Sequence, residues 1–531
     1  MCISRDMLMR RQRAILMVGS LLLNLFCSGQ TVMHIENAQT WTTDKLSRYV
    51  GQTVRFDAPF YVTNNYGFSS GTYTVSPRRI YSPTNQEYPM TEGYTTIVSL
   101  NTSGTLSLSG ISGYHRMGER IQNLTVRIIG TNSMQWVSGE WVGNTRTELE
   151  AGIPSVDILG EHTLLVCAFN LEYYLAENLG TGYGPDNEVQ HARQKNKIST
   201  ALNKIRADVF GFVEIEQGQT ALAELADTLT AMTGKKYSYI DDGGSANSSY
   251  TKSGYVYCTE TLKPVGALKS NNTRVQNRKK MQAFQEISTG EHFIFSINHF
   301  KAKSGTGTGM NADQGDGQGT FNYDRVQEAQ SVLTDYQSNR AYYGDPDILI
   351  MGDLNAYAKE DPITTLVKGG MTDLHRYFHE DTAYSYVFRG TAGYLDHALT
   401  NRTLLEQVTG VAAYHINSDE DDSFTYDGRN NDGTMFRCSD HDPVLVGLRL
   451  GAAHTDLNIV RVTATYGGLN ILNADGGYYM VGNTDGTLLT RGDINSNDYV
   501  VNLPLQSGFY IVTVYANGTA EAHKLMVVGN R

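Results

Sequence analysis

The strongest constraint on the fold lies in the middle of the chain, where almost continuously apolar segments alternate with helical ones. The apolar segments have the length and composition of buried strands, and they run over 163–170, 207–215, 292–300 and 347–355. Helical segments intervene at 188–207 and 323–337, and the second places on one face Val326, Ala329, Val332, Leu333 and Tyr336. Buried strands need both faces of their sheet covered, so this pattern predicts an α/β core with helices over its sheets.

The regions on either side of this core are rich in turns. From 31 to 152, short apolar runs are separated by Gly, Asn and Ser clusters, which is typical of a small all-β domain. The spacing fits an OB-like barrel, a fold that can bind single strands on stacked aromatic residues; Tyr61, Tyr66 and Tyr73 are available for this. A docking domain whose tyrosines only cover strands is the alternative. From 452 to 531 the pattern predicts a separate β-sandwich, which leaves 153–451 for the core domain.

The first 30 residues have the pattern of an exported protein. Four arginines (Arg5, Arg10, Arg11 and Arg13) precede an apolar run that is short for a membrane span, and small and polar residues follow. This pattern predicts a signal peptide that is cleaved near Gly29 or Gln30, with a membrane anchor as the alternative. Cys27 raises the possibility of a lipoprotein, but Phe26 stands where a small residue is expected. We therefore predict a secreted or cell-surface protein.

Charge and cysteine content exclude some classes of function. The formal net charge of −12 argues against a protein that wraps nucleic acid by bulk electrostatics, although it allows an enzyme with metal ions and a local basic patch. Outside the leader the cysteines are Cys167, Cys258 and Cys438, and their wide spacing predicts neither a disulfide framework nor a zinc site. Cys167 lies in an apolar strand pattern and is expected to be a core residue.

Polar residues follow the strand that ends in the sequence ILIMGDLNAY (348–357). Asp353 and Asn355 come directly after four apolar residues, and a period of two places them on the same side. Ligands of α/β sheets bind beyond the carboxyl ends of the strands. On its own, this motif fits a turn with an Asx hydrogen bond equally well.

Other strand ends repeat the arrangement. They present Asn170 and Glu172, Glu214 and Glu216, His299, Asp396 and His397, and Asp440, His441 and Asp442. Each group alone has an ordinary structural explanation, but six such strand ends are improbable as independent accidents. Carboxylate and carboxamide oxygens suit Mg²⁺ or Ca²⁺, and histidines add acid–base capacity. The set predicts metal-assisted hydrolysis of a phosphodiester.

At this point the sequence resembles a known family. The motifs FNLEYY, FGFVEIE, INHFKAKSG, IMGDLNA, YLDHAL and SDHDPV occur in the order found in the endonuclease/exonuclease/phosphatase superfamily, which has the DNase I-like fold. The resemblance covers residues 163 to 450, and the stretches at 311–325 and 415–428 are similar to the secreted bacterial nucleases of that superfamily. It implies an α/β four-layer sandwich, in which two packed β-sheets are flanked by helices.

The resemblance also implies roles for individual residues. Glu214 would be the main metal ligand, joined by Asn170, Glu172 and Asp440, and the cofactor would be Mg²⁺, with Mn²⁺ or Ca²⁺ as alternatives. Asp353 and Asn355 would orient or activate the attacking water, and Asp396 would support a histidine. His441 would contact the scissile phosphate or act as base, and His299 would protonate the leaving 3′ oxygen. Arg278 would contact phosphate or the minor groove. The implied products carry a 5′-phosphate and a 3′-hydroxyl.

Two charged stretches complete the expectations for the core domain. The basic stretch 263–280 is expected to face a polyanionic substrate, with Lys263, Lys269, Arg274, Lys279 and Lys280 beside Arg278. The acidic run Asp419, Glu420, Asp421 and Asp422 is expected to be solvated.

The C-terminal region has a looser likeness, because residues 455–531 resemble the sorting domain of the type IX secretion system, with an adhesive sandwich as the alternative. The sequence as a whole predicts a monomeric, secreted, metal-dependent nuclease that acts on DNA and does not insert into membranes. RNA remains a further candidate substrate. A phosphodiesterase of the same fold that acts on sphingolipid or inositol phosphates is the enzymatic alternative, and a non-catalytic surface adhesin is the alternative from another class.

Overall fold

The computed structural model describes most of the chain after the leader. The described residues are 31–87, 92–243, 250–270, 278–451, 460–465, 468–472, 474–496, 498–503, 505–506, 508–516 and 519–527. The predicted signal peptide, 1–30, lies outside them. The chain divides into two compact units: the first holds the chain up to Arg79 together with Leu100–Asn144, and the second holds Ile80–Ser99 together with Thr145–Arg531. The predicted domain bounds stay predictions.

The first unit is a single, strongly curved sheet. Its strands are β1 (Thr31–Met33), β2 (Thr53–Phe56), β3 (Phe60–Asn64), β4 (Thr72–Ser76), β5 (Leu106–Ser109), β6 (Arg120–Gly130) and β7 (Ser133–Val142). The strand order is β1-β2-β6-β3-β4-β5-β7, and β6 also pairs with β7, so the pairings close a ring through the long β6 strand. The OB-like assignment stays a prediction.

The tyrosines predicted as a stacking surface in this unit have different environments. Tyr73 is buried and donates its hydroxyl to the carbonyl oxygen of Gly113, whereas Tyr66 is exposed. The parallel rings of the unit lie elsewhere, because Trp141 stacks between His115 and Trp136 with interplanar angles of 10° and 13°.

The second unit contains two six-stranded sheets. The first sheet has the order β10-β11-β9-β8-β21-β20, with β8 (Leu164–Tyr174), β9 (Val209–Glu216), β10 (Tyr237–Tyr239), β11 (Thr251–Cys258), β20 (Val408–Ala413) and β21 (Val444–Leu448). The second has the order β12-β13-β14-β15-β19-β16, with β12 (Leu262–Ser270), β13 (Lys279–Glu286), β14 (His292–His299), β15 (Ile348–Asp353), β16 (Thr372–Asp373) and β19 (Asp396–Thr400). Parallel pairs β8–β9 and β14–β15 lie at the centre of the sheets.

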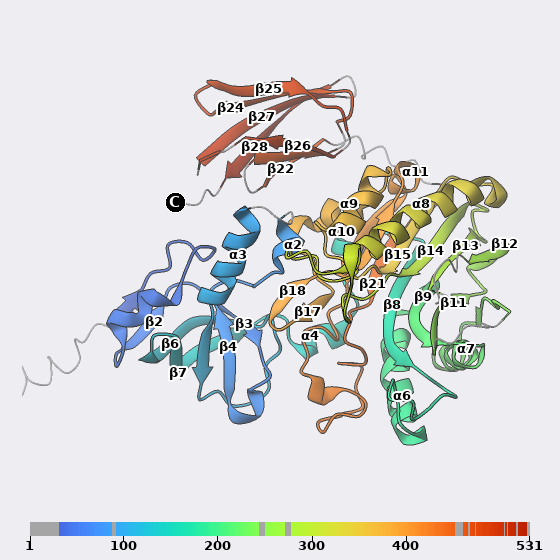
Figure 1. Ribbon diagram of the computed structural model, residues 1–531, viewed down its shortest axis with the longest axis horizontal. Helices are drawn as coiled ribbons and strands as arrows, with labels where there is room; N and C mark the ends of the chain where they lie inside the picture. Colours follow the sequence, from blue (N-terminus) through green and yellow to red (C-terminus); the bar gives the residue numbers. More distant parts are fainter. Residues whose placement is uncertain are drawn as a thin grey trace, which may run out of the picture. The chain divides into compact units, whose positions relative to one another are not determined.

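Helices cover the outer faces of both sheets. One apolar cluster joins the two sheets face to face through residues such as Val166, Phe295 and Met351. Two further clusters pack the helices α6 (Glu188–Ile205) and α7 (Thr220–Thr233) against the first sheet, and α8 (Asn322–Tyr343) and α9 (Asp361–Lys368) against the second. Figure 1 shows these two pairs of helices on opposite sides of the sheets. The predicted α/β architecture of sheets and covering helices is confirmed.

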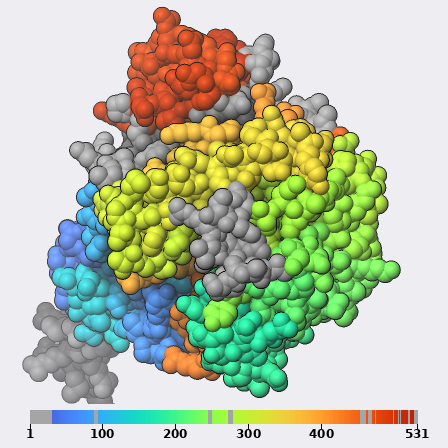
Figure 2. All heavy atoms as spheres, turned by 45° about the vertical axis from the view of Figure 1, so that its right-hand side comes forward, coloured from blue at the N-terminus to red at the C-terminus, as the bar shows by residue number. Residues whose placement is uncertain are grey.

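Short elements fill the connections of this domain. They are α4 (Arg146–Ala151), α5 (Val156–Leu159), α10 (Leu374–His379) and α11 (Arg402–Leu405), and the hairpin of β17 (Tyr386–Phe388) and β18 (Thr391–Gly393). The space-filling view shows the outer surface of the domain, where the yellow residues of α8 form a band across it (Figure 2).

A segment from the N-terminal half belongs to the second unit. Residues 80–99 connect β4 to β5 and include α2 (Pro83–Gln86) and most of α3 (Glu92–Ser103). Tyr81 forms a parallel bridge with Ala392, and the amide of Ser82 donates to the carbonyl oxygen of Ala392 at 2.7 Å. The segment thus contacts the β17–β18 hairpin through one isolated bridge.

The C-terminal region forms two antiparallel sheets around one apolar cluster. One sheet has β22 (Arg461–Thr465), β23 (Gly468–Leu472) and β26 (Asp498–Asn502); the other has β24 (Tyr478–Asn483), β25 (Leu488–Asp493), β27 (Gly508–Ala516) and β28 (Thr519–Val527). The resemblance to a sorting domain stays a prediction. Among the described residues, no helix is long and apolar enough to span a membrane. Cys167, Cys258 and Cys438 are buried free thiols, as expected for Cys167.

Candidate active site

The centre of the site is Asp353, the last residue of β15. Gly352 before it has a φ of +123°, and a Cβ at Gly352 would lie 2.0 Å from the carbonyl oxygen of Asn298 on β14. Only glycine therefore allows β14 and β15 to pair this closely at their ends. Asn355 follows with a φ of +48°, and this turn brings its side-chain amide to within 3.1 Å of Asp353 Oδ2, to which it donates. The two side chains meet because of the turn and not because of strand periodicity.

Glu214 reaches the site because β9 is irregular. Its φ is +59°, a strained value for a residue with a side chain inside a strand. The sequence pattern treats Glu214 and Glu216 alike, but the structure separates them. Glu216 is fully buried and accepts the amide hydrogens of Ala176, Glu177 and Asn178 at 2.7 to 2.9 Å. Glu214 accepts one amide hydrogen bond, from Tyr173 at 3.2 Å, and its Oε1 lies 3.7 Å from His299 Nε2.

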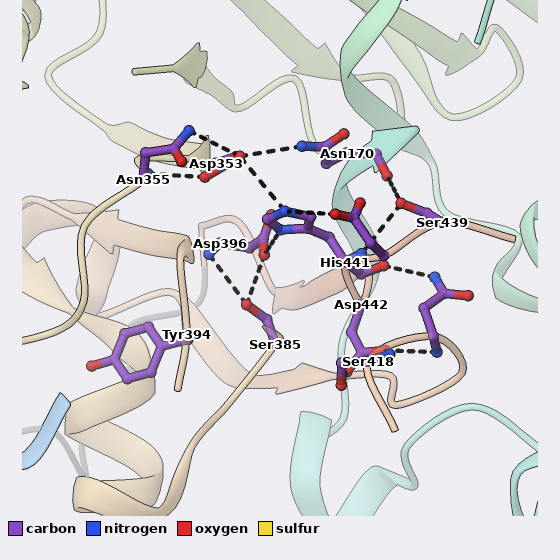
Figure 3. A network of polar contacts seen from close by, with 12 residues as sticks. Asn170, Asp353, Asn355, Ser385, Tyr394, Asp396, Ser418, Ser439, His441 and Asp442 are labelled. Carbon is purple, nitrogen blue, oxygen red and sulfur yellow. Dashed lines mark hydrogen bonds and ion pairs between the residues drawn. The ribbon is translucent and has the colours of Figure 1, made fainter. Parts of the chain in front are cut away.

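The end of β8 supplies two more of the predicted ligands. The side-chain amide of Asn170 donates to Asp353 Oδ2 at 3.2 Å, which links the two sheets at the site (Figure 3). The amide of Glu172 donates to Asn170 Oδ1 at 3.0 Å, and Glu172 has a φ of +51°. His299, at the end of β14, places its Nε2 3.7 Å from Glu214 Oε1 and 3.7 Å from Asp353 Oδ2.

A buried carboxylate–imidazole pair faces Asp353. Asp396 Oδ2 lies 2.7 Å from His441 Nδ1, and the hydroxyl of Ser385 donates to the same Asp396 oxygen at 2.7 Å. This pairing directs His441 Nε2 toward Asp353 Oδ2 at 3.8 Å and Asp440 Oδ2 at 3.9 Å (Figure 3). Burial lowers the pKa of His441, but Asp396, Asp440 and Asp353 outweigh it and raise that pKa well above its ordinary value. The carboxylates around His441 therefore favour the protonated form of its imidazole when no cation is bound.

Three carboxylates at this centre have raised pKa values, and burial is the main cause in each. Burial, together with the charge of Asp440, raises the pKa of Glu172 to about 8 and that of Glu214 to about 7. Burial also raises the pKa of Asp353 to about 6, although His441 opposes the rise. Carboxylates gathered in this way repel one another when ionised, and a bound cation removes that cost.

The donor set fits a divalent metal ion of the Mg²⁺ class. Glu172, Glu214 and Asp440 offer hard oxygen ligands, and Asn170 offers a carboxamide oxygen beside them. Asp353, Asp396 and His441 also have donor atoms within 4.8 Å of one another. In that second group the shortest contact is the Asp396–His441 hydrogen bond, so these residues satisfy each other and leave the first group as the better metal site.

Basic side chains flank the carboxylates. Burial lowers the pKa of Arg278, whereas nearby carboxylates raise it. Glu214 has the largest effect among these carboxylates, so the guanidinium lies near the proposed metal ligand. Its Nε is buried and makes no hydrogen bond within the described part of the chain. Burial, Arg278, His441 and Lys301 together lower the pKa of His299 well below its ordinary value. The site thus combines Arg278, Lys301 and a His441 of raised pKa around a His299 of lowered pKa.

All ten residues predicted from the sequence lie in or beside this constellation, although nothing yet tests their roles. The basic stretch around Arg278 is less available than expected. Lys280 and Lys252 both pair with buried Asp242, and Lys279 donates to the hydroxyl of Ser331. Residues 271–277, which include Arg274, lie outside the described residues.

The expectation for the acidic run 419–422 was wrong for three of its four residues. Asp419, Glu420 and Asp421 are buried. The guanidinium of Arg146 donates to both oxygens of Glu420 and lies over the ring of Phe424 at 4.3 Å. Only the side chain of Asp422, at 71% exposure, is solvated as expected. The run is a folded part of the loop that precedes Asp440.

Sequence reasoning missed residues that support the catalytic ones. Ser385 holds Asp396, Tyr386 stacks on His441 with ring centroids 4.7 Å apart, and the hydroxyl of Ser439 donates to the carbonyl oxygen of Asn170 at 2.7 Å. The only available signal for these three residues was their position beside recognised motifs. His397, which the sequence pattern did point to, hydrogen-bonds the carbonyl oxygen of Ala356 at 2.8 Å and so holds the turn that carries Asn355.

Comparisons with known proteins agree with this geometry. Residues 178–441 match the sequence profile described as the Endonuclease/Exonuclease/phosphatase family. A comparison with proteins of curated function finds no match.

Similar solved structures include an endonuclease/exonuclease/phosphatase from Bacteroides vulgatus, with 15% identity over 54% of this chain and 98% of that chain and a TM-score of 0.36. A mannosyl-6-phosphatase from Bacteroides thetaiotaomicron has 16% identity over 54% and 99% of the two chains, with a TM-score of 0.37. The catalytic domain of human Nocturnin has 13% identity over 53% and 93%, with a TM-score of 0.36.

Proposed function

Since residues 178–441 match the profile of the Endonuclease/Exonuclease/phosphatase family, we propose that the chain is a metal-dependent nuclease that hydrolyses the phosphodiester bonds of DNA. One observation carries the proposal. Partly buried carboxylates with raised pKa values, at Glu172 and Glu214, lie beside the basic Arg278 and beside His441, whose pKa is also raised. This pairing of a cation site with groups that bind anions suits a phosphate ester.

Glu214, Glu172, Asp440 and Asn170 are proposed to hold the cation, with Mg²⁺ as the first candidate and Mn²⁺ or Ca²⁺ as alternatives. When bound, the cation would neutralise charge on the phosphoryl oxygens. Arg278, whose buried Nε lacks a partner among the described residues, is proposed to donate to a non-bridging phosphate oxygen.

Two side chains of the protein are assigned one proton transfer each. Asp353 is held by the backbone amide of Asn355 at 2.8 Å and by its side chain, so its carboxylate is fixed to orient a water molecule and accept its proton. His441 is held by Asp396 and its pKa is raised, so we assign to it the transfer of a proton to the leaving 3′ oxygen. The pKa of His299 is lowered, so this residue is assigned a hydrogen bond to the phosphate, in place of the acid role that the family resemblance implies. The products would be a 5′-phosphate and a 3′-hydroxyl.

The leader pattern and the C-terminal resemblance support export, and we propose that the enzyme acts outside the cytoplasm, with the type IX machinery as its route. A monomer is the simplest state for this chain. RNA is a second candidate polymer, because the constellation contains no group that recognises the base or the 2′-hydroxyl.

The direct test is to incubate the purified mature chain with linear and circular double-stranded DNA, first with Mg²⁺ and then with excess chelator. Chelator-sensitive loss of both forms is expected for an endonuclease, and loss of the linear form alone for an exonuclease. His441→Ala is the matched control and should lose at least ~10²-fold in rate. If the folded wild-type chain cleaves neither DNA nor RNA, the proposal fails and phosphodiesters of sphingolipids and inositol phosphates become the next substrates to examine.

A further inference from the structure

A row of rings leads from His441 to the surface of the domain. Tyr386 stacks on the imidazole of His441, with ring centroids 4.7 Å and planes 28° apart. Phe388, two residues further along β17, lies nearly parallel to Tyr386, with centroids 6.4 Å and planes 10° apart. Phe388 is 51% exposed, so the row ends in a flat apolar face in contact with solvent. An exposed aromatic ring this close to a catalytic residue requires an explanation beyond packing.

The hairpin that carries this row is held by hydrogen bonds at its base and is exposed to solvent at its tip. At the base, Ser385 bonds Asp396, and the inserted segment pairs with β18 through Tyr81 and Ala392. The hydroxyl of Tyr81 also donates to the carbonyl oxygen of Thr382 at 3.0 Å. Phe388 therefore has a rigid support, and a contact that it makes with a ligand does not need to order a mobile loop first.

The tip of the hairpin also carries a free cation. The guanidinium of Arg389 lies over the Phe388 ring, 5.1 Å from its centroid. Within the described part of the chain Arg389 pairs with no carboxylate, and it is exposed. An exposed ring with such a guanidinium matches a nucleotide, whose base stacks on rings and whose phosphate attracts arginine.

We propose that Phe388 and Arg389 form a stacking subsite for a nucleobase next to the scissile phosphate, which continues the row of His441 and Tyr386. This inference rests on the proposed nuclease function and specifies how the polymer is positioned. The base stacks on Phe388, Arg389 contacts the adjoining phosphate, and the scissile phosphate is thereby placed at His441 and Asp353. Stacking of this kind accepts any base, so the subsite favours polynucleotides without selecting a sequence.

A membrane surface is the competing occupant of an exposed aromatic hairpin. Membrane insertion needs several apolar residues that enter the bilayer together. On this hairpin Phe388 is the single large apolar residue that is exposed, Val387 is partly buried, and the next residue along is the charged Arg389. The composition of the tip therefore favours a nucleobase over a lipid.

The test compares two single-stranded oligonucleotides of equal length, one of thymidines and one in which abasic tetrahydrofuran residues replace the nucleosides. Wild-type, Phe388→Ala, Phe388→Leu and Phe388→Trp proteins are assayed with Mg²⁺ for kcat and KM. We expect Phe388→Ala and Phe388→Leu to lose about 5- to 100-fold in kcat/KM on the thymidine strand, in the range of one lost base stack. We expect no loss on the abasic strand and recovery by Phe388→Trp.

The outcomes separate this inference from the proposed function. If wild type cleaves the thymidine strand and Phe388→Ala cleaves it equally well, the subsite is wrong while the nuclease function stands. An equal loss on both strands also overturns it, because Phe388 would then only support the position of His441. Loss of binding to sphingomyelin vesicles, with oligonucleotide cleavage unchanged, would assign the hairpin to a membrane. If the wild-type protein cleaves neither oligonucleotide, nor double-stranded DNA, nor RNA, both the proposed function and this inference are wrong.

Discussion

Two glutamates of the same domain show how differently one side chain can be used. Glu224 on α7 accepts hydrogen bonds from Tyr174 at 2.5 Å, Lys195 at 2.9 Å and His191 at 3.0 Å. Burial alone would raise its pKa, but these bonds lower it to about 2. Glu214 on β9 has a single amide donor, and its pKa rises to about 7 because of burial and the charges of Asp440 and Asp353.

The difference lies in how many donors the fold supplies. Glu224 is saturated by neighbouring side chains, so its charge stabilises the packing of α6 and α7 and leaves nothing for a ligand. Glu214 has fewer hydrogen-bond donors and a strained backbone with positive φ. This arrangement does not stabilise the fold. Titratable groups with such perturbed pKa values cluster at functional sites, so Glu214 and Glu224 should respond differently to substitution.

The largest expected effect is on catalysis by the Glu214→Gln variant. Loss of the carboxylate removes the main proposed cation ligand, so kcat/KM on DNA with Mg²⁺ should fall about 10³-fold, the upper range for removal of one key electrostatic group. The matched variant Glu224→Gln should stay within about 2-fold of wild type, in line with a surface change outside the site. Equal losses in both variants would erase the distinction between the two glutamates.

A smaller effect is expected for Asp396→Asn. This variant keeps the size of the side chain but removes the charge that holds the proton of His441, so the rate should fall about 10²-fold. The rate at saturating Mg²⁺ and DNA is the measurement, with the near-ultraviolet circular dichroism spectrum as the check on folding. A rate within a factor of two of wild type would show that the pair is structural, like His191 and Glu224.

A still smaller effect should follow from Ser385→Ala. Ser385 touches neither the proposed cation ligands nor the phosphate contacts and acts through Asp396, to which it donates one hydrogen bond. The rate should fall about 2- to 10-fold, as expected for one hydrogen bond. Ser385→Thr retains the hydroxyl and should recover part of the loss. If Thr and Ala at this position behave identically, the hydroxyl does not position Asp396.

The smallest effect concerns stability alone. At pH 7 Glu224→Gln should reduce the free energy of unfolding by about 1–2 kcal/mol, because its hydrogen bonds lose their charge. The pKa of Glu224 is lowered from 4.5 to about 2 in the folded state, so its contribution is present above pH 4.5 and is lost as the pH falls toward 2. Denaturant unfolding of both proteins between pH 7 and pH 3 should show the difference shrinking below pH 4.5. A difference that grows as the pH falls would contradict the assignment.

Part of this site can be predicted from the sequence for a physical reason. Polar residues at the ends of apolar strands gather at one edge of the sheets, so Asn170, His299, Asp353 and Asp396 were found from position alone. The motifs of the family distinguished Glu214 from Glu216 and added Arg278. The fold class followed from the alternation of buried strands and helices.

Other features depend on partners that are distant in sequence. Glu214 and Glu216 have the same local pattern, and only the positive φ at Glu214 and the amide donors at 176–178 separate them. The acidic run 419–422 was expected to be solvated because no partner for its charges lies nearby in the sequence. Arg146, which pairs with Glu420, is 274 residues away. Neither the pairing of Tyr81 with β18 nor the stacking of Tyr386 on His441 leaves a trace in local composition.

The most direct measurement of the central claim is calorimetric titration of Mg²⁺ into wild type, Glu214→Gln and Glu224→Gln at pH 7, in two buffers with different ionisation enthalpies. Raised pKa values mean that the metal-free centre holds protons that a cation must displace. The account predicts that wild type and Glu224→Gln bind Mg²⁺ and release protons, whereas Glu214→Gln binds at least ~10-fold more weakly. Equal binding by all three proteins without proton release would contradict it.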